Sequence, residues 1–381
     1  MQRLIFPVNS YQYYTNKTII YSMPYYSKIQ DKRTAEGLLR LKQGLSEAKV
    51  PKRNVSDSIL LATWNIREFG DSKQGLRTDE PLYYIAEIIN AFDLVAVQEV
   101  RSNLKLLNKL MSILGGWWKV VYTDVTLGMR GNDERLTFLY DSRKISFGGL
   151  AGEIVIPPKR TKEKVLTPAN QLARTPYLAG FRSGWFKFTL CVNHILYGKG
   201  ISVDPNRLEE IQVIANTLAD MTKDKHAWAK NMILLGDFNI FNPKDVTMKA
   251  IIDAGFIVPK KLQSVTSNIA DDPKKGKHYD QIAFISPDQK DKLELCESGV
   301  FNFFKYVYRM EDEEEYAEAM GSKYSDKDIE ERTKHYKTWR TFQMSDHLPM
   351  WIELGIDYSK SYLERKASTT ITVDPETSTQ P

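Results

Sequence analysis

Short apolar segments mixed with amphipathic helical segments constrain the fold of this 381-residue chain most strongly. Uninterrupted apolar runs of this length are typical of buried strands, and the helices must then cover the sheets. The predicted strands are residues 59–64, 94–97, 137–140, 177–188, 189–195, 232–235, 281–285 and 350–354. The predicted helices are residues 34–49, 82–91, 104–114 and 206–221. This pattern predicts an α/β architecture, and consecutive strands without a helix between them argue against a simple doubly wound sheet.

The composition is that of an ordinary soluble globular protein, with 42% hydrophobic and 27% charged residues. It excludes wholesale disorder, a collagen-like fibre and a disulfide scaffold. A net charge of +5 says little about polyanion binding. The only cysteines, Cys191 and Cys296, suit a reducing compartment, so we expect a cytoplasmic protein. No apolar run is long enough to span a membrane, and residues 4–6 are too short for a signal-peptide core.

The chain divides into three predicted regions. Residues 1–56 form an N-terminal extension, in which a tyrosine-rich stretch over residues 11–26 predicts short strands before the first helix. Residues 57–358 form the main domain. Residues 359–381 are expected to be a mostly disordered tail, because their second half is rich in Thr, Ser and Pro. The charged segment 311–334 is interpreted as a solvated helix face rather than a partner surface.

Polar residues with metal-binding or acid/base chemistry recur at the ends of the predicted strands. In chain order these residues are Asn65, Glu99, His194, Asp237, Asn239, Asp280, Asp346 and His347. One such strand end has a plain explanation, since Asn and Asp also start turns. A whole series is harder to explain in that way, because strand ends are where α/β proteins build their sites.

The oxygen donors among these residues are the ligands that Mg²⁺, Mn²⁺ or Ca²⁺ prefer, and no thiolate accompanies them to favour zinc. A Mg²⁺ ion, for which Mn²⁺ can substitute, together with carboxylates and histidines suits the hydrolysis of a phosphoester. The metal neutralises phosphate oxygens, a carboxylate or imidazole activates water, and an acid protonates the leaving oxygen.

The ordered motifs resemble those of the endonuclease/exonuclease/phosphatase superfamily, and in particular its deoxyribonuclease I-like members. They are Trp64-Asn65-Ile66-Arg67, Gln98-Glu99-Val100-Arg101, Asn193-His194, Gly236-Asp237-Phe238-Asn239, Tyr279-Asp280 and Ser345-Asp346-His347. The resemblance covers about residues 58–355. It implies a two-sheet α/β sandwich with the site at one edge of the sheets.

The resemblance also implies roles for individual residues. Glu99 is the main metal ligand, supported by Asn65 and Asp346. His194 and His347 flank the scissile phosphate as an acid/base pair. The residues that orient them or position water and transition-state oxygens are Glu134, Asp280, Asp237 and Asn239. We favour His347 with Asp280 as the base, and Asp237 stays an alternative.

Three arginines match phosphate-contacting or groove-contacting residues of these relatives: Arg174, Arg67 and Arg101. A guanidinium can bind phosphate through two parallel hydrogen bonds, so lysine would be a poor replacement. One departure concerns a groove-stacking tyrosine of the family, whose position falls at about Asn132 here. Basic residues in the segments 157–162 and 272–277 could attract a polyanion or merely aid solubility.

The sequence therefore predicts a Mg²⁺-dependent phosphodiesterase, and most specifically an endonuclease whose partner is DNA. Two alternatives stay open. One is a phosphomonoesterase or phospholipid-head-group phosphodiesterase of the same superfamily, similar to inositol phosphatases or sphingomyelinases. The other is a catalytically inactive binding module, which the presence of every motif residue disfavours. The Tyr279-Asp280-Gln281-Ile282 sequence is more similar to the deoxyribonuclease form than to that of the inositol phosphatases.

Overall fold

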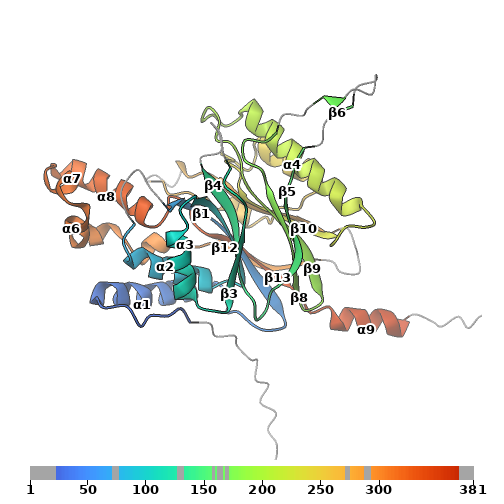
Figure 1. Ribbon diagram of the computed structural model, residues 1–381, viewed down its shortest axis with the longest axis horizontal. Helices are drawn as coiled ribbons and strands as arrows, with labels where there is room; N and C mark the ends of the chain where they lie inside the picture. Colours follow the sequence, from blue (N-terminus) through green and yellow to red (C-terminus); the bar gives the residue numbers. More distant parts are fainter. Residues whose placement is uncertain are drawn as a thin grey trace, which may run out of the picture.

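Two β-sheets, stacked face to face between layers of helices, form the centre of the molecule (Figure 1). The computed structural model describes residues 23–70, 77–126, 133–156, 159–160, 166–167, 171–270, 275–286 and 293–368. The sheets mix parallel and antiparallel strands. The two-sheet α/β sandwich predicted from the sequence is thereby confirmed.

The first sheet has six strands in the order β12-β13-β1-β2-β4-β3. These strands are β1 (Ser58–Phe69), β2 (Leu94–Arg101), β3 (Trp118–Tyr122), β4 (Glu134–Asp141), β12 (Glu294–Val300) and β13 (Met350–Gly355). β1 and β2 run parallel, β13 pairs antiparallel with β1, and β4 pairs antiparallel with β2. The ends of β1 and β2 therefore share one edge with the starts of β4 and β13.

The second sheet has five strands in the order β11-β10-β9-β8-β5. These strands are β5 (Ser146–Glu153), β8 (Tyr177–Ser183), β9 (Phe186–His194), β10 (Asn231–Asp237) and β11 (Asp280–Ile285). β9 and β10 run parallel, and β11 pairs antiparallel with β10. The ends of β9 and β10 again share an edge with the start of β11. A separate small pair joins β6 (Lys159–Arg160) to β7 (Leu166–Thr167).

Helices cover the outer face of each sheet (Figure 1). Beside the six-stranded sheet lie α1 (Lys32–Glu47), α2 (Glu80–Asn90) and α3 (Lys105–Leu114). Beside the five-stranded sheet lie α4 (Pro205–Lys223) and α5 (Val246–Asp253). Asp204 begins α4 because its carboxylate accepts hydrogen bonds from the amides of Asn206 and Arg207.

The core between the sheets is built from apolar side chains on their facing surfaces. Ile59 and Leu61 of β1, Phe138 of β4 and Phe188 of β9 have no exposed surface. They alternate with side chains on the opposite face, as the pleat of a strand requires. Burying each aliphatic or aromatic side chain of this kind stabilises the fold by about 1.5–3 kcal/mol.

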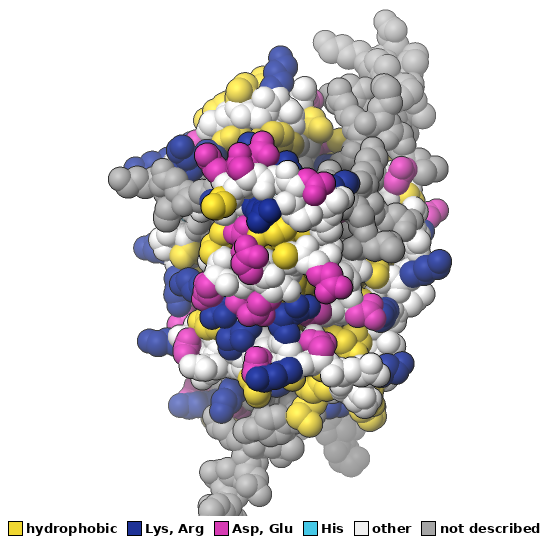
Figure 2. All heavy atoms as spheres, turned by 90° about the vertical axis from the view of Figure 1, so that its left-hand side faces the viewer, with side chains coloured by type: hydrophobic (Ala, Val, Ile, Leu, Met, Phe, Trp, Pro, Cys, Tyr) yellow, Lys and Arg dark blue, Asp and Glu magenta, His cyan; other side chains and the backbone are white. Residues whose placement is uncertain are grey.

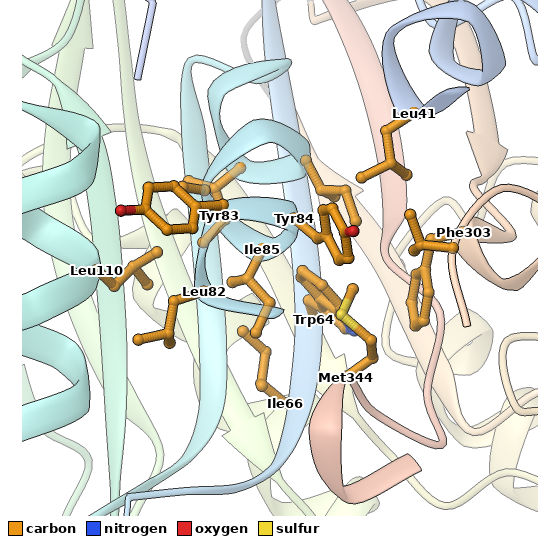
Figure 3. Close-up of a cluster of buried hydrophobic side chains, with 14 of the residues drawn as sticks. Leu41, Trp64, Ile66, Leu82, Tyr83, Tyr84, Ile85, Leu110, Phe303 and Met344 are labelled. Carbon is orange, nitrogen blue, oxygen red and sulfur yellow. The ribbon is translucent and has the colours of Figure 1, made fainter. Parts of the chain in front are cut away.

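A second apolar cluster fills the space between the six-stranded sheet and its helices (Figure 3). Trp64 of β1 lies at its centre, with Tyr84 of α2 and Leu41 of α1 nearby. Phe303 and Met344 close the cluster from a later part of the chain. The first predicted region therefore contributes α1 to the same core as the main sheet.

A helical insertion between β12 and β13 forms one end of the molecule (Figure 1). It contains the 3-10 helices η3 (Phe303–Lys305) and η4 (Met310–Tyr316), then α6 (Ala317–Met320), α7 (Ser322–Ser325) and α8 (Ile329–Gln343). On the face of this end shown in Figure 2, acidic and basic side chains are interspersed. That arrangement agrees with a solvated surface for the charged segment rather than a patch of one sign.

Four buried charges form an ion-pair cluster between β1, β2 and β4. The Arg53 guanidinium donates to Asp93, at 2.7 Å, and to Asp141, at 2.6 Å. The Lys144 ammonium donates to the other oxygen of Asp93 at 2.8 Å. That oxygen also accepts the backbone amide of Leu60 at 2.9 Å. Both carboxylates are fully buried, so each depends on its cationic partners.

Several predicted elements differ in the structure. The segments 177–188 and 189–195 are divided earlier than predicted, because a turn at Gly184, where φ is +55°, separates β8 from β9. The tail predicted to be mostly disordered from residue 359 begins with a helix, α9 (Ser359–Ser368). Tyr362 of α9 packs edge-on against Trp185, which gives this exposed helix a tertiary contact. The rest of the predicted tail lies outside the described residues.

The tyrosine-rich strands predicted over residues 11–26 fall largely outside the described residues. The described part of that stretch, 23–26, is not a strand, although the Tyr25 amide donates to the Ile113 carbonyl at 2.7 Å. Cys191 is buried and Cys296 is exposed, and both are free thiols. Within the described ranges, no helix combines the length and apolar character that crossing a membrane requires.

Candidate active site

The strand ends of both sheets meet at one edge of the sandwich. In the six-stranded sheet, the register pairs Arg101 with Glu134, so the end of β2 faces the start of β4. In the five-stranded sheet, Asp237 at the end of β10 pairs with both His194 and Asp280. These pairings explain why residues far apart in the sequence come together here.

Asp237 lies between two histidines at the centre of this edge. Its Oδ2 atom is 3.5 Å from Nε2 of His194 and 3.7 Å from Nε2 of His347. Each histidine uses its other nitrogen to contact a carboxylate: Nδ1 of His194 is 3.0 Å from Glu134, and Nδ1 of His347 is 2.8 Å from Asp280. Both imidazoles therefore present Nε2 to the same point.

The local charges shift the pKa values of these groups. Burial lowers the pKa of His347, but Asp280 and Asp237 outweigh burial and raise it well above its usual value. The pKa of His194 is raised in the same way, chiefly by Glu134 against burial. For Asp237, burial acts to raise the pKa, but the two histidines outweigh burial, so the pKa lies below its usual value. The pKa of Asp280 is raised, with burial as the largest cause.

Glu99 sits where the β2 ladder is interrupted. The pairing of β2 with β4 shifts register between Val97 and Val100, which marks a bulge. Glu99 has φ of +62°, a left-handed conformation that is uncommon for a side chain of this kind. Bulges beside active sites re-aim side chains, and here one Glu99 oxygen comes within 4.8 Å of ligand atoms of Glu134 and His194.

The predicted metal ligands do not all gather around Glu99. Asn65 donates from Nδ2 to Oδ2 of Asp237 at 3.1 Å, so it joins the histidine group. Asp346 is partly exposed and pairs with Arg67, with 3.6 Å between the charged atoms. A second set of potential ligands is formed by Asp237, Asp280 and His347.

The three predicted phosphate-binding arginines lie around the site in different settings. Arg174 is buried, forms an ion pair with Glu134, and donates to the His194 carbonyl at 3.2 Å. Arg174 therefore holds both the carboxylate partner and the backbone of His194. The Arg67 guanidinium stacks 3.8 Å from the Phe342 ring centroid, and that of Arg101 lies 3.7 Å from a carboxylate oxygen of Glu68.

Ser345 fixes the loop that carries His347. Its hydroxyl donates to the Asn65 carbonyl at 2.6 Å and accepts the amides of Arg67 and His347 at 3.2 and 3.0 Å. The Trp64 indole donates to the His347 carbonyl at 2.9 Å. The loop before β13 is thus hydrogen-bonded to the end of β1 through the Ser345 hydroxyl and the Trp64 indole.

Arg77 is a residue of this site that the sequence did not reveal. It is buried, and it donates to the carbonyls of Gln343 and Phe342 at 2.7 and 3.1 Å and of Arg67 at 2.8 Å. The last carbonyls of a helix lack partners within the helix, and a cation there is favourable. Arg77 therefore joins the end of α8 to β1, directly before the His347 loop.

We expect Arg77→Ala to lower the turnover number by roughly 100-fold, because a displacement of about 1 Å in a catalytic group has that effect. Arg77→Lys keeps the charge but lacks the forked donors, so it should restore only part of the activity. Initial rates at saturating substrate, measured beside urea denaturation curves, separate misplacement from unfolding. Arg182→Ala, at an exposed position of the otherwise buried strand β8, is the control. Equal rates for Arg77→Ala and this control would contradict the positioning role.

The Gly236-Asp237-Phe238-Asn239 segment has a backbone that few residues could replace. At Gly236, φ is +134°, and an added Cβ would lie 2.1 Å from the Asn193 carbonyl oxygen. Asn239 has φ of +52°, its amide donates to Asp237 at 2.9 Å, and its side chain donates to the Ile195 carbonyl at 2.8 Å. This turn holds Asp237 in place between the histidines.

The fold and the site together define a class of protein: two-sheet α/β sandwiches that carry paired histidine–carboxylate groups at one edge. No family model matches the sequence. Deoxyribonuclease-1 from Bos taurus is 27% identical over 190 residues, which are 48% of this chain and 61% of that protein. Deoxyribonuclease gamma from Rattus norvegicus is 25% identical over 277 residues, 68% of this chain and 80% of that protein.

The chain spans 61% of the bovine protein and 34% of the rabbit deoxyribonuclease-1 that it also matches. A solved endonuclease/exonuclease/phosphatase family protein from Bacteroides thetaiotaomicron has a TM-score of 0.49 and 18% identity, over 79% of this chain and 98% of that one. The chain is thus similar in sequence to deoxyribonucleases over part of its length, which confirms the resemblance to deoxyribonuclease I-like proteins predicted from its motifs.

Proposed function

We propose that this protein is a metal-dependent phosphodiesterase that cuts DNA endonucleolytically. The observation that carries the proposal is the placement of Asp237 between Nε2 atoms of His194 and His347, each held by its own carboxylate. Two imidazoles aimed at one point suit a reaction that takes a proton on one side of a phosphate and returns one on the other. The names of the matched relatives support DNA as the substrate.

The residues present fit a Mg²⁺ or Mn²⁺ ion. Oδ1 of Asn65 is buried and has no hydrogen-bond partner among the described residues, which leaves an oxygen available to a cation. Glu99 contributes a carboxylate beside Glu134, and hard divalent cations prefer such oxygen donors. Bound here, the cation would neutralise charge on the phosphate oxygens. We assign Glu99 and Asn65 to hold it. Asp346, which pairs with Arg67 and lies outside the Glu99 group, stays a proposed further ligand from the loop before β13.

The protein's own groups would divide the proton transfers between them. Asp280 and Glu134 fix the orientation of the two imidazoles through Nδ1, so only Nε2 of each faces the phosphate. One Nε2 accepts the proton of the attacking water and the other donates to the leaving oxygen. Asp237, held by the Asn239 amide and by Asn65, orients the water between them. Arg67 and Arg101 are proposed to bind flanking phosphates.

The first test is nicking of supercoiled plasmid by the purified protein with Mg²⁺, with Mn²⁺ or with EDTA. We expect relaxed circles with either metal and intact plasmid in EDTA. Absence of nicking with both metals, from protein with a normal circular dichroism spectrum, would remove DNA endonuclease activity from consideration. Short phosphomonoesters and RNA would then be assayed with the same preparation.

Glu99→Gln should raise the Mg²⁺ concentration needed for half-maximal nicking by at least about 10-fold, the effect of disturbing even an indirect metal contact. The amide keeps the shape of the side chain but removes the charge that attracts the cation. A Mg²⁺ titration of activity, paired with calorimetric titration of metal into protein, measures the change. Glu297→Gln, on the exposed side of β12, is the matched control, and identical midpoints for the two variants would refute the assignment.

A further inference from the structure

Three aromatic rings gather beside His347, and no step of the proposed hydrolysis uses them. Tyr197 follows β9, Phe241 follows β10, and Tyr279 directly precedes β11. The ring centroid of Tyr279 is 5.5 Å from that of Phe241 and 6.2 Å from that of Tyr197. Its distance to the His347 ring is 5.7 Å. The cluster therefore begins at the catalytic imidazole and extends away from it.

A buried arginine holds this aromatic cluster in place. Arg207 of α4 has no exposed surface, and it donates to the carbonyls of Tyr197 at 2.8 Å and Ser202 at 2.6 Å. Its guanidinium also lies 4.9 Å from the centroid of Phe241. One side chain thus holds the Tyr197 loop and supports the Phe241 ring, so the aromatic surface is formed before any ligand arrives.

The cluster is open to solvent on its outer side. Tyr197 is 46% exposed, whereas aromatic residues that only pack a core bury most of their surface. The Lys277 ammonium lies 4.8 Å from the centroid of the Phe241 ring. Among the described residues, no carboxylate lies within ion-pair distance of that ammonium. The surface therefore offers an aromatic face and a cation together.

We propose that Tyr197, Phe241 and Tyr279 form a stacking subsite for an unpaired base next to the phosphate held at His347. An aromatic face takes a base without regard to its identity, and the nearby ammonium takes the phosphate that follows. The base must be unpaired, because stacking inside a duplex already covers both of its faces. The subsite rests on the proposed nuclease function and directs it to single-stranded DNA or to duplexes with unpaired nucleotides.

The test is fluorescence anisotropy with a labelled single-stranded oligonucleotide and with the same sequence as a duplex, both in EDTA so that no cleavage occurs. Tyr197→Ala should weaken single-strand binding by roughly 5- to 100-fold, the range found when a base-stacking aromatic residue is truncated. Tyr197→Phe keeps the ring and should bind as the wild type does. Trp117→Ala removes another exposed aromatic ring at the opposite edge of the sheets, and should leave binding unchanged.

Equal losses of duplex and single-strand binding in Tyr197→Ala would overturn the subsite, and so would no loss in either. Wild-type protein that shows no affinity for the single strand would overturn it too. Failure of the endonuclease proposal shows itself differently, as absent plasmid nicking with metal present. Because the binding assay contains EDTA and needs no turnover, the two results are independent.

Discussion

Asp237→Ala is expected to abolish plasmid nicking, with a fall in rate of at least about 1000-fold, within the range for loss of a group that assists proton transfer. The carboxylate is buried and faces Nε2 of both His194 and His347, so its removal takes away a group that contacts both imidazoles. Initial rates on supercoiled plasmid with saturating Mg²⁺ measure the loss. The same variant should still show the two-sheet fold by circular dichroism.

The matched control for this experiment is Asp220→Ala. Asp220 lies on α4, its side chain is 75% exposed, and it pairs with Lys223 on the surface. We expect wild-type nicking from it. If Asp237→Ala retained the turnover of this control in a preparation free of contaminating nuclease, the assignment of the active site to this edge would be wrong.

Asp93→Ala is expected to lower the free energy of unfolding by about 3–5 kcal/mol, the loss typical of breaking a buried ion pair. Its carboxylate contacts Arg53 and Lys144 and accepts the Leu60 amide. Removing it takes a buried carboxylate away from both cations, Arg53 and Lys144. Urea denaturation followed by tryptophan fluorescence gives the change in unfolding free energy.

An exposed lysine–aspartate ion pair provides the control for the Asp93→Ala experiment. Lys249 and Asp253 are four residues apart on α5, and both side chains are more than half exposed. Surface pairs contribute little, so Asp253→Ala should shift the unfolding free energy by no more than about 0.5 kcal/mol. Indistinguishable denaturation curves for the two variants would show that the buried cluster does not stabilise the sandwich.

The strands that the sequence reveals are those with continuous apolar runs. β2 and β10 fall where the runs at 94–97 and 232–235 predict them, because both faces of these strands are covered. β5 and β12 were not predicted. They lie at sheet edges, where most of their side chains are exposed or partly exposed, so no periodic apolar signal marks them.

The residues of the candidate site that lie at strand ends were predictable from the sequence. The predicted residues His194, Asp237, Asp280 and His347 do lie together, since parallel strands bring their ends to one edge. Arg77 was not predictable, because its bonds to Phe342 and Gln343 reach backbone carbonyls some 265 residues away and leave no pattern in its neighbours. The ion pair of Arg174 with Glu134 was likewise not predictable, because the sequence context indicates only a phosphate contact, which stays a prediction.

Glu99 and Asn239 both have a left-handed backbone conformation, which lowers stability at two positions where the side chain belongs to the candidate site. Such a conformation costs a side-chain-bearing residue roughly 1–2 kcal/mol, and glycine would adopt it freely. Laboratory evolution that rewarded heat resistance alone would therefore favour glycine at both places. Each such gain in melting temperature would remove a carboxylate or an amide from the edge that carries the candidate site, so selection for robustness would have to be coupled to selection for the proposed activity.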